Sequence, residues 1–571
     1  MKKTLIKSVI IFLMMNVIYI SVKAEIGTNV KVDQNGYLPD EYKYFIVTSQ
    51  SKNFIIKRVE DNKPVFYGEL KGRPISDYDS GDSCYIGDFS KFKQPGQYFI
   101  ETDKAGLSYH FKISNNILQN ALYKVMRGFY LQRCGIEVKD PEGYGHPACH
   151  LKPAMLHPAL LEKGEIDVTG GWHDAGDYGK YVVNSGISTA TLLYAYERYP
   201  EKLRNFKSDI PQQIEEFLPD ILAEAKWNID WMLKMQRKDG AVYHKVTTEQ
   251  FPNMQKKAEE DEMQQYIYEI TTTATANLAA VAAIAARVYK EFNNDFANKC
   301  LVAAEKAWNF LYYHQEQIPK GGFKNPAGTN TGQYSDGFDG DERFWAAMEL
   351  FLTTGKETYK EYVLKNYNYW EPVVAAPAYW WEVYVLGMFS YLYSTRKDRD
   401  EQLIDKIKND LEKHADLLLD RINKNGYKYV LEEKDYIWGS NSVALNYAIN
   451  LLVASEFLYN GRTADYRQAA MEILHYLFGR NPFSKSYVTG IGQNYVRNIH
   501  HRPSVSDNID EPYPGLLAGG PNMKKSDPVL KRLSFDTPAA RCFVDDTGSY
   551  ASNEIAINWN APLAYVLASL M

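Results

Sequence analysis

The chain has 571 residues, which is too long for one ordinary domain, and its 45% hydrophobic and 24% charged residues describe a soluble globular protein. A net charge of −6, without a run of Lys or Arg, argues against a nucleic-acid partner. Aromatic residues make up 14% of the chain, which suits a protein that stacks sugar faces and equally suits a tyrosine-rich helical core.

The first 24 residues read as a cleaved secretory signal. Three lysines in the first seven residues precede an apolar run from Val9 to Ile20, and small residues at Val22 and Ala24 offer a cleavage site. The apolar run is too short for a comfortable membrane span, and no later stretch is long enough. We therefore expect an exported protein without a membrane span, either periplasmic or secreted.

Residues 25–113 read as a small all-β domain. Short strands separated by Gly, Asp or Pro predict an immunoglobulin-like β-sandwich, which we expect to pack against the rest and not to catalyse. The expected strands are Val30–Gln34, Tyr44–Thr48, Phe54–Val59, Val65–Leu70, Cys84–Phe89, Gly96–Thr102 and Ser108–Ile113.

Helical periodicity dominates from Ser114 to the end, residues 114–571. Alternating short and long loops between the helices predict stacked helical hairpins in an α/α barrel, with the long loops gathered at one end as a cleft. A solenoid would show a repeat in the sequence, and this sequence shows none. The expected helices are 116–132, 183–198, 212–236, 271–291, 293–315, 341–354, 357–366, 381–395, 400–421, 442–458, 463–479 and 551–570.

Two aspartates stand three residues apart in the glycine-rich stretch from Gly170 to Lys180. Asp174 and Asp177 repel each other when both are charged, so such a pair suits a grip on a metal, a sugar or a water that loses a proton. The alternative is an Asx-turn that caps the helix starting near Tyr181.

A second polar and aromatic stretch runs from Phe543 to Pro562 and leads into an apolar terminal helix. Glu554 is expected at the start of that helix. It is either a capping carboxylate or an acid of raised pKa that faces the two aspartates across a cleft.

A third stretch runs from Ser486 to Asn494 and continues to His500, His501 and Arg502. Adjacent histidines followed by arginine are candidates for metal ligands or for donors to sugar hydroxyls. A surface cluster without a role is the alternative.

Together the three stretches resemble the family 9 glycoside hydrolases over nearly the whole mature chain. Residues 171–180 resemble the paired-aspartate motif, residues 486–502 the histidine signature, and residues 543–561 the acidic signature of that family. The stretch from Val32 to Tyr37 resembles the start of the immunoglobulin-like module that often precedes the catalytic domain. The resemblance implies an (α/α)6 barrel.

The resemblance also implies an inverting endo-β-1,4-glucanase. It makes Glu554 the general acid and Asp177 the base, with Asp174 sharing the grip on the nucleophilic water. His500 and Arg502 would hydrogen-bond the sugar beside the scissile bond. Asp545 and Tyr550 are motif positions expected to orient the acid and line the cleft.

Aromatic platforms suit pyranose faces. Trp438 resembles a cleft position of the family, and Trp380 and Trp381 are further candidates. Core packing is the better interpretation for three tryptophans inside helical runs, Trp227, Trp231 and Trp345.

Two metal sites are expected. Cys134, Cys149, His150 and His173 form a Cys2His2 set that suits structural zinc, as found in similar family members; the alternative is a Cys134–Cys149 disulfide. The remaining cysteines, Cys84, Cys300 and Cys542, are interpreted as packing residues.

The second site is an acidic loop that resembles a calcium loop of the family. Its alternative is a solvated loop that caps the helix at Asp341. The expected ligands are Asp336, Asp339, Asp341 and Glu342.

Three functions are weighed. The first is an exported, monomeric endo-β-1,4-glucanase acting on cellulose-like glucan, mixed-linkage glucan or xyloglucan. No binding module is expected after the last helix, which favours soluble or amorphous glucan. The second is an exo-acting glucosidase or glucosaminidase of the same family. The third is a non-catalytic glucan-binding protein, which the presence of both Asp177 and Glu554 disfavours.

Overall fold

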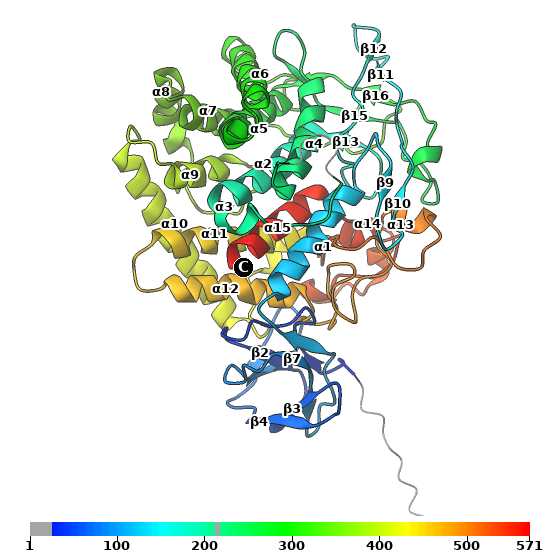
Figure 1. The fold of residues 1–571 in the computed structure, drawn as a ribbon, viewed down its shortest axis with the longest axis vertical. Helices are drawn as coiled ribbons and strands as arrows, with labels where there is room; N and C mark the ends of the chain where they lie inside the picture. Colours follow the sequence, from blue (N-terminus) through cyan, green and yellow to red (C-terminus); the bar gives the residue numbers. More distant parts are fainter. Residues whose placement is uncertain (1–25, 212–216) are drawn as a thin grey trace, which may run out of the picture.

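The computed structural model describes residues 26–211 and 217–571. A small β-sandwich lies at one end of a larger helical body (Figure 1). Strands continue to Ile113 and the first helix begins at Ile117, so the change in sequence pattern near Ser114 coincides with the change in structure. The proposed signal peptide, residues 1–24, lies outside the described residues.

The sandwich consists of two four-stranded antiparallel sheets, ordered β1-β2-β6-β5 and β4-β3-β7-β8. Inward-facing residues alternate with outward-facing ones, and aromatic rings such as Tyr37, Phe45 and Phe54 fill the space between the sheets. The strands are β1 Val30–Lys31, β2 Tyr44–Val47, β3 Asn53–Arg58, β4 Pro64–Glu69, β5 Ile75–Ser76, β6 Ser83–Asp88, β7 Gly96–Thr102 and β8 Phe111–Ile113.

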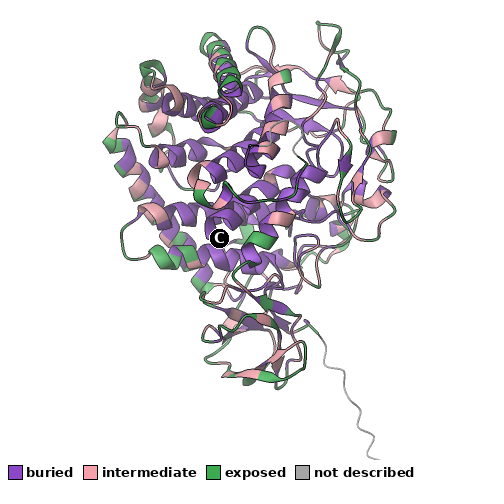
Figure 2. Ribbon diagram, in the orientation of Figure 1, coloured by how far each residue is buried: buried purple, intermediate pink, exposed green. Residues whose placement is uncertain are grey.

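Six inner helices form a ring, and successive members contact one another from α2 to α5, α7 and α9, and from α11 through α15 back to α2. They are buried almost throughout, as Figure 2 shows, which explains why apolar and small residues occur on all of their sides. The inner helices are α2 Val182–Arg198, α5 Thr272–Val288, α7 Gly340–Thr354, α9 Tyr384–Tyr393, α11 Ser440–Phe457 and α15 Ile557–Leu570.

Six outer helices pack against the ring and are amphipathic, with charged residues toward solvent. The arrangement is the expected (α/α)6 barrel. Every inner helix follows a long connection, so the long loops gather at the end where the inner helices begin. The outer helices are α1 Ile117–Leu131, α4 Asp220–Lys234, α6 Asn294–Tyr313, α8 Glu357–Asn366, α10 Glu401–Lys424 and α12 Thr463–Leu477.

The long loops carry short strands and helical turns. One five-stranded sheet has the order β12-β11-β16-β15-β13, and two further pairs are β10-β9 and β14-β17. The strands are β9 Val138–Lys139, β10 Gly145–His146, β11 Ala154–Leu156, β12 Glu165–Ile166, β13 Lys180–Tyr181, β14 Val242–Tyr243, β15 Lys245–Thr247, β16 Tyr266–Ile267 and β17 Ile270–Thr271. The short helices are α3 Pro200–Leu203, α13 Arg502–Ser506 and α14 Tyr550–Asn553, and the 3-10 turns are Ala258–Glu260, Tyr289–Glu291, Tyr367–Tyr369, Glu433–Asp435, Leu530–Arg532 and Ala539–Arg541.

One helix prediction was wrong in a way that matters for the site. The expected helix 551–570 is two helices, because the chain is extended at Glu554 and again at Ala556 before α15 begins. Glu554 therefore does not cap the terminal helix. The expected helix 212–236 lies partly outside the described residues, and its described part forms α4.

The sandwich and the barrel share a buried polar interface. His475 on α12 lies 2.7 Å from Asp33, with Nδ1 toward a carboxylate oxygen, and both side chains are buried. Lys31 Nζ donates to the carbonyl of Pro482 at 3.1 Å. The side-chain carbonyl of Gln34 accepts from the amides of Gln493 and Asn494 at 3.1 and 2.8 Å, inside the histidine signature.

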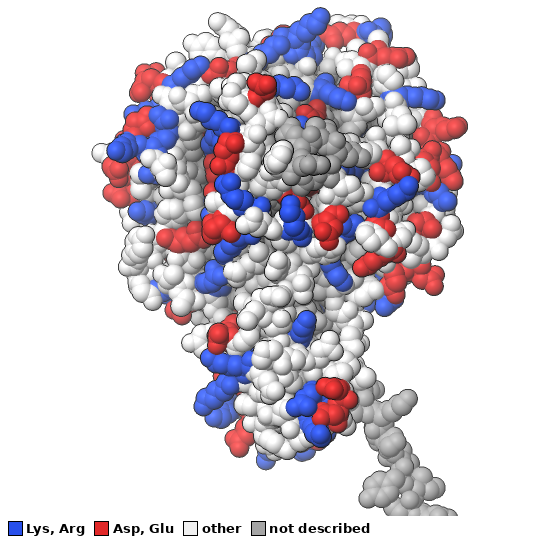
Figure 3. Space-filling view, viewed as in Figure 1, with Lys and Arg blue, Asp and Glu red and all other residues white. Residues whose placement is uncertain are grey.

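Charges of both signs are interspersed on the face that Figure 3 shows, without a continuous basic field. Among the described residues, none of the helices has the length and apolar character that crossing a bilayer requires.

Candidate active site

A cleft of about 680 Å³ opens at the loop end of the barrel. Its walls come from the segments that precede α2, α7, α9, α11 and α15, so residues far apart in sequence meet there. Asp174, Asp177 and Glu554 all line this one cleft.

Asp174 is held on both carboxylate oxygens. Asn184 on α2 donates to Oδ1, and the hydroxyl of Tyr334 donates to Oδ2 at 2.6 Å. Burial raises the pKa of Asp174 to about 7, with a smaller contribution from the neighbouring Asp177 charge, while the two hydrogen bonds act in the opposite direction.

The backbone of the aspartate loop is fixed by close contacts. Oδ2 of Asp177 accepts from the amide of Gly179 at 3.0 Å, so the expected Asx-turn does form, but it does not cap α2. Gly176 packs against the carbonyl of His500, where an added Cβ would come within 1.9 Å. Glycine is required there because the two loops approach each other directly.

Glu554 leaves α14 in an extended conformation, and its carbonyl accepts from the amide of Gly519 at 2.8 Å. Its pKa lies well above the ordinary range, first because of burial and then because Asp177 and Asp174 lie nearby. A carboxyl group of raised pKa that shares a cleft with a pair of aspartates is a candidate proton donor.

His500 is half-buried beside the cleft. Nδ1 donates to the carbonyl of Thr547 at 2.6 Å, because a carbonyl can only accept. Burial lowers the pKa of His500, so the ring is neutral and Nε2 is a hydrogen-bond acceptor. The neutral ring leaves Nε2 able to accept a hydrogen bond, whereas the sequence suggested a donor.

Arg502 and Asp545 lie outside the cleft wall, and both hold backbone. Arg502 donates through Nη1 to the carbonyl of Gly176 at 2.9 Å and through Nε to the carbonyl of Pro252 at 2.8 Å. Asp545 accepts from the amides of Arg497 and Asn498, at 3.2 and 2.9 Å for Oδ1.

Asp545 also accepts from the side chain of Asn553 at 3.1 Å, next to Glu554. Asp545 therefore connects the loop at Arg497 and Asn498, which leads to His500, with the segment that carries Glu554. It does not line the cleft. The alternative of a surface cluster at His500, His501 and Arg502 is wrong, because His501 and Arg502 are buried and His500 is half-buried.

Aromatic rings form the cleft walls. Trp438 and Trp381 line the cleft, with 44% and 38% of their surface exposed. Tyr550 packs against the ring of Trp438 at 5.5 Å and lies 5.9 Å from the ring of His500. Trp380 and Phe251 also line the cleft, whereas Trp231 and Trp345 are buried in the core as expected.

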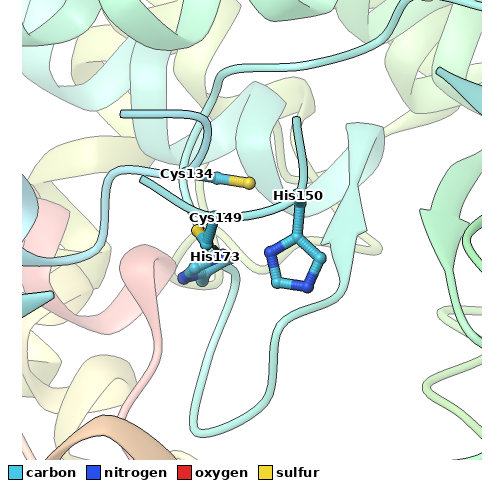
Figure 4. A group of neighbouring side chains, drawn as sticks. All are labelled: Cys134, Cys149, His150 and His173. Carbon is cyan, nitrogen blue, oxygen red and sulfur yellow. Dashed lines mark hydrogen bonds between the residues drawn. The ribbon is translucent and has the colours of Figure 1, made fainter. Parts of the chain in front are cut away.

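The Cys2His2 set comes together (Figure 4). One ligand atom from each of Cys134, Cys149, His150 and His173 lies within 4.8 Å of the others, and both cysteines are free, so the alternative disulfide is absent. Nδ1 of each histidine is buried without a partner. His150 Nε2 lies 3.3 Å from Asp261, an arrangement that orients the ring for a metal. The donors fit tetrahedral zinc.

Three of the four expected calcium ligands also come together. One oxygen each of Asp336, Asp341 and Glu342 lies within 4.8 Å of the others. Both oxygens of Glu342 and one each of Asp336 and Asp341 are buried without a hydrogen-bond partner, which fits a hard divalent cation. Asp339 is not in this group, because its Oδ2 pairs with Arg343 at 2.9 Å.

The alternative for Asp341 was a helix cap. Oδ2 of Asp341 accepts from the amide of Val383 at 2.8 Å, outside its own helix, so it does not cap α7. Burial raises the pKa of Asp336 to about 6 and that of Asp341 to about 7. It also raises the pKa of Glu342 well above its ordinary value.

Sequence reasoning missed Tyr334 and Asn184, which hold Asp174. Tyr334 follows Gly332 and Gln333 in a loop, and Asn184 lies in the first turn of α2, ten residues after Asp174. The position of Asn184 on the cleft side of an apolar helix was a usable signal. Nothing local marked Tyr334, because its partner is 160 residues away.

Comparison with known protein families divides the chain into a β-sandwich part and a helical part, as the fold does. The model of glycosyl hydrolase family 9 matches residues 119–567, and that of the cellulase N-terminal ig-like domain matches residues 25–106. "Endoglucanase D" of Acetivibrio thermocellus is 34% identical over 553 residues, covering 96% of this chain and 84% of that protein. "Cellodextrinase" of Butyrivibrio fibrisolvens is 34% identical, covering 95% of this chain and 99% of that protein.

A crystal structure of the family 9 endoglucanase J30 superposes with a TM-score of 0.87 at 34% identity, covering 93% of this chain and 99% of that one. The likeness thus extends over both the sandwich and the barrel. The chain is a glycoside hydrolase and belongs to glycosyl hydrolase family 9.

Proposed function

We propose that the protein is an inverting endo-β-1,4-glucanase. The observation that carries the proposal is the meeting of an aspartate pair and a carboxyl group of raised pKa in one open, aromatic-walled cleft. The endoglucanases among the similar proteins support the same substrate class.

In the proposed reaction Asp177 is the base that removes a proton from the attacking water. Asp174 is the second acceptor for that water, with its carboxylate fixed by Asn184 and Tyr334. Glu554 gives its proton to the glycosidic oxygen as the bond breaks. An inverting enzyme needs about 6.5–9.5 Å between acid and base so that the water fits beneath the sugar.

Trp438 and Trp381 are the proposed sugar platforms, because exposed indole faces match the C–H faces of a pyranose. Tyr550 supports Trp438 from the side. His500 is proposed to accept from a sugar hydroxyl. Arg502 and Asp545 are proposed to act through the loops that they hold.

Two metals are proposed to stabilise the loops. Zinc held by Cys134, Cys149, His150 and His173 would anchor the loop that carries Asp174, since His173 directly precedes it. A calcium ion held by Asp336, Asp341 and Glu342 would fix the start of α7, just after Tyr334. Neither metal takes part in the reaction.

We further propose an immunoglobulin-like domain at 25–113 and a catalytic domain at 114–571. The sequence of residues 1–24 supports export to the periplasm or beyond. A single chain supplies every group named above, which supports action as a monomer on a glucan polymer or oligosaccharide.

The second candidate is action on short cello-oligosaccharides from chain ends. The similarity to a protein named "Cellodextrinase", over 99% of its length, favours it. The two candidates differ in how fast a polymer is shortened.

The deciding experiment follows viscosity and products on carboxymethyl-cellulose, xyloglucan, mixed-linkage glucan and cello-oligosaccharides. The endoglucanase predicts a fast fall in viscosity with mixed oligomers and inverted anomeric configuration in the first product. One small sugar with steady viscosity would favour the second candidate, and retained configuration would contradict the roles of Asp177 and Glu554.

A further inference from the structure

Two fully buried basic side chains lie behind the turn that carries Tyr334. His244 and Lys245 are consecutive residues, and each has an exposed surface of 0%. Nε2 of His244 donates to the carbonyl of Gln333 at 3.0 Å, and Nζ of Lys245 donates to the carbonyl of Gly332 at 2.7 Å. Neighbouring side chains therefore hold the two carbonyls that precede Tyr334.

Tyr334 needs such support because its backbone is in the left-handed region, with φ of 45°. That conformation is unfavourable for a residue with a bulky side chain, and it persists where the surroundings impose it. In this conformation the hydroxyl reaches Oδ2 of Asp174 at 2.6 Å. Gly332 is also constrained, because an added Cβ would lie 2.9 Å from the hydroxyl of Tyr181.

Residues 244–245 also contact the chain on the Asp174 side of the hydrogen bond between Tyr334 and Asp174. Lys245 pairs with Tyr181 in the antiparallel β13–β15 ladder, and the carbonyl of His244 accepts from the amide of Val182 at 3.0 Å. Tyr181 and Val182 lie where the aspartate loop enters α2. Residues 244–245 therefore connect the Asp174 loop and the Tyr334 turn.

Neither basic residue lines the cleft, so neither reaches a substrate. Nζ of Lys245 also donates to Asn325 Oδ1 at 2.8 Å and Thr331 Oγ1 at 3.2 Å, and it lies 4.4 Å from the ring of Tyr268. Burial lowers the pKa of His244 to about 3, so its ring is neutral, with Nε2 as the donor and Nδ1 facing the hydroxyl of Thr271.

We propose that His244 and Lys245 are positioning residues of the hydrolytic reaction. They fix the carbonyls of Gln333 and Gly332, so that Tyr334 adopts its left-handed turn and holds Asp174 in register for the attacking water. The inference rests on the proposed glucan hydrolysis and adds residues that the cleft itself does not show.

The first test is Lys245→Met in the full chain, measured for kcat and KM on a soluble cello-oligosaccharide. We expect kcat to fall by about 100-fold, since a misplacement of about 1 Å has that effect, with KM changed less than about twofold. Lys43→Met is the matched control. Lys43 is also fully buried and donates to the carbonyls of Pro39 and Glu41 at 2.7 and 3.0 Å, but it lies in the sandwich. The control should lower Tm without lowering kcat.

The second test is coupling to Tyr334. If Lys245 acts through Tyr334, then Lys245→Met should cost much less in a Tyr334→Phe background than in the wild type. Full additivity of the two effects on kcat would overturn the proposal. A Lys245→Met enzyme with wild-type kcat would overturn it as well.

His244 provides an independent series should Lys245→Met not fold. His244→Leu removes the donor to the Gln333 carbonyl and is expected to lower kcat, whereas His244→Gln keeps an N–H donor and should restore much of it. Equal loss in both variants would contradict the proposed role. If the wild type hydrolyses no glucan, the proposed function fails instead, and the two failures are thus distinct.

Discussion

The carbonyl oxygen of Asp174 accepts a 2.9 Å hydrogen bond from the amide of Ile557, the first residue of α15. Ile557 follows Glu554 by three residues, so this bond joins the aspartate loop directly to the acid segment. It also satisfies one of the amides that a helix start leaves without an internal partner. A backbone hydrogen bond therefore holds the loop of the two aspartates against the segment of Glu554.

Replacing Glu554 by Gln removes the proton donor while keeping the shape of the side chain. We expect kcat on unactivated glucan to fall by about 10²- to 10⁴-fold, as for loss of a general acid. An aryl glycoside with a good leaving group should lose far less, because its departure needs little protonation. Asp177→Asn is the comparison and should abolish both activities. Equal loss on both substrates in Glu554→Gln would contradict the acid assignment.

The raised pKa of Glu554 predicts the alkaline limb of the pH profile. In the proposed reaction the protonated form of Glu554 is the active one, so kcat/KM should fall as pH rises through its raised folded-state pKa. Because the folded state favours the proton more than the unfolded state does, stability also decreases in that direction. In Glu554→Gln the alkaline limb should disappear from the profile measured on the activated substrate. A wild-type profile that falls near pH 4.5 would show that the side chain ionises normally.

Zinc binding predicts a stability effect that is specific to one set of cysteines. Cys149→Ser should abolish bound zinc in metal analysis and lower Tm by at least about 5 °C, since structural zinc contributes several kcal/mol to folding. Cys300→Ser is the control, because Cys300 is equally buried and free but lies on α6. Purified protein without zinc, with a Tm that chelators leave unchanged, would exclude the site.

The acidic site predicts a calcium effect that depends on pH. Protons compete for Asp336 and Asp341, whose pKa values are raised to about 6 and 7. Without a cation, the folded state loses stability as pH rises through these values, because three buried carboxylates must then share one space. The gain in Tm on adding calcium should therefore be small at pH 5 and large at pH 8.

Glu342→Gln should remove most of this calcium response, whereas Glu357→Gln, at the exposed start of α8, should leave it intact. A calcium response of equal size at pH 5 and pH 8 would contradict binding at these carboxylates.

The sequence was sufficient for the fold and for the three cleft carboxylates. Period-2 and period-3.6 patterns reflect which faces are buried, and Asp174, Asp177 and Glu554 stand in local motifs. What it missed depends on contacts between distant segments. The partner of Tyr334 is 160 residues away, and the break in the last helix at Glu554 follows from pairing with His500 and Gly519.

The contacts of Arg502 could not be predicted from the sequence either. Its motif suggested a donor to sugar, yet two of its donors are taken by the carbonyls of Gly176 and Pro252. Likewise, Asp339 belongs to the acidic loop by sequence but pairs with Arg343, one helical turn later. Residue type alone does not specify which of several nearby partners a side chain contacts.

The side chain of Gln34 connects the sandwich to a loop of the barrel that leads toward the cleft. It holds the amides of Gln493 and Asn494, and the same loop continues to His500 at the cleft. An exchange of catalytic barrels between proteins would therefore have to carry the matching sandwich surface with it. The part of this chain that would have to be exchanged as one piece is therefore larger than the barrel that contains the cleft.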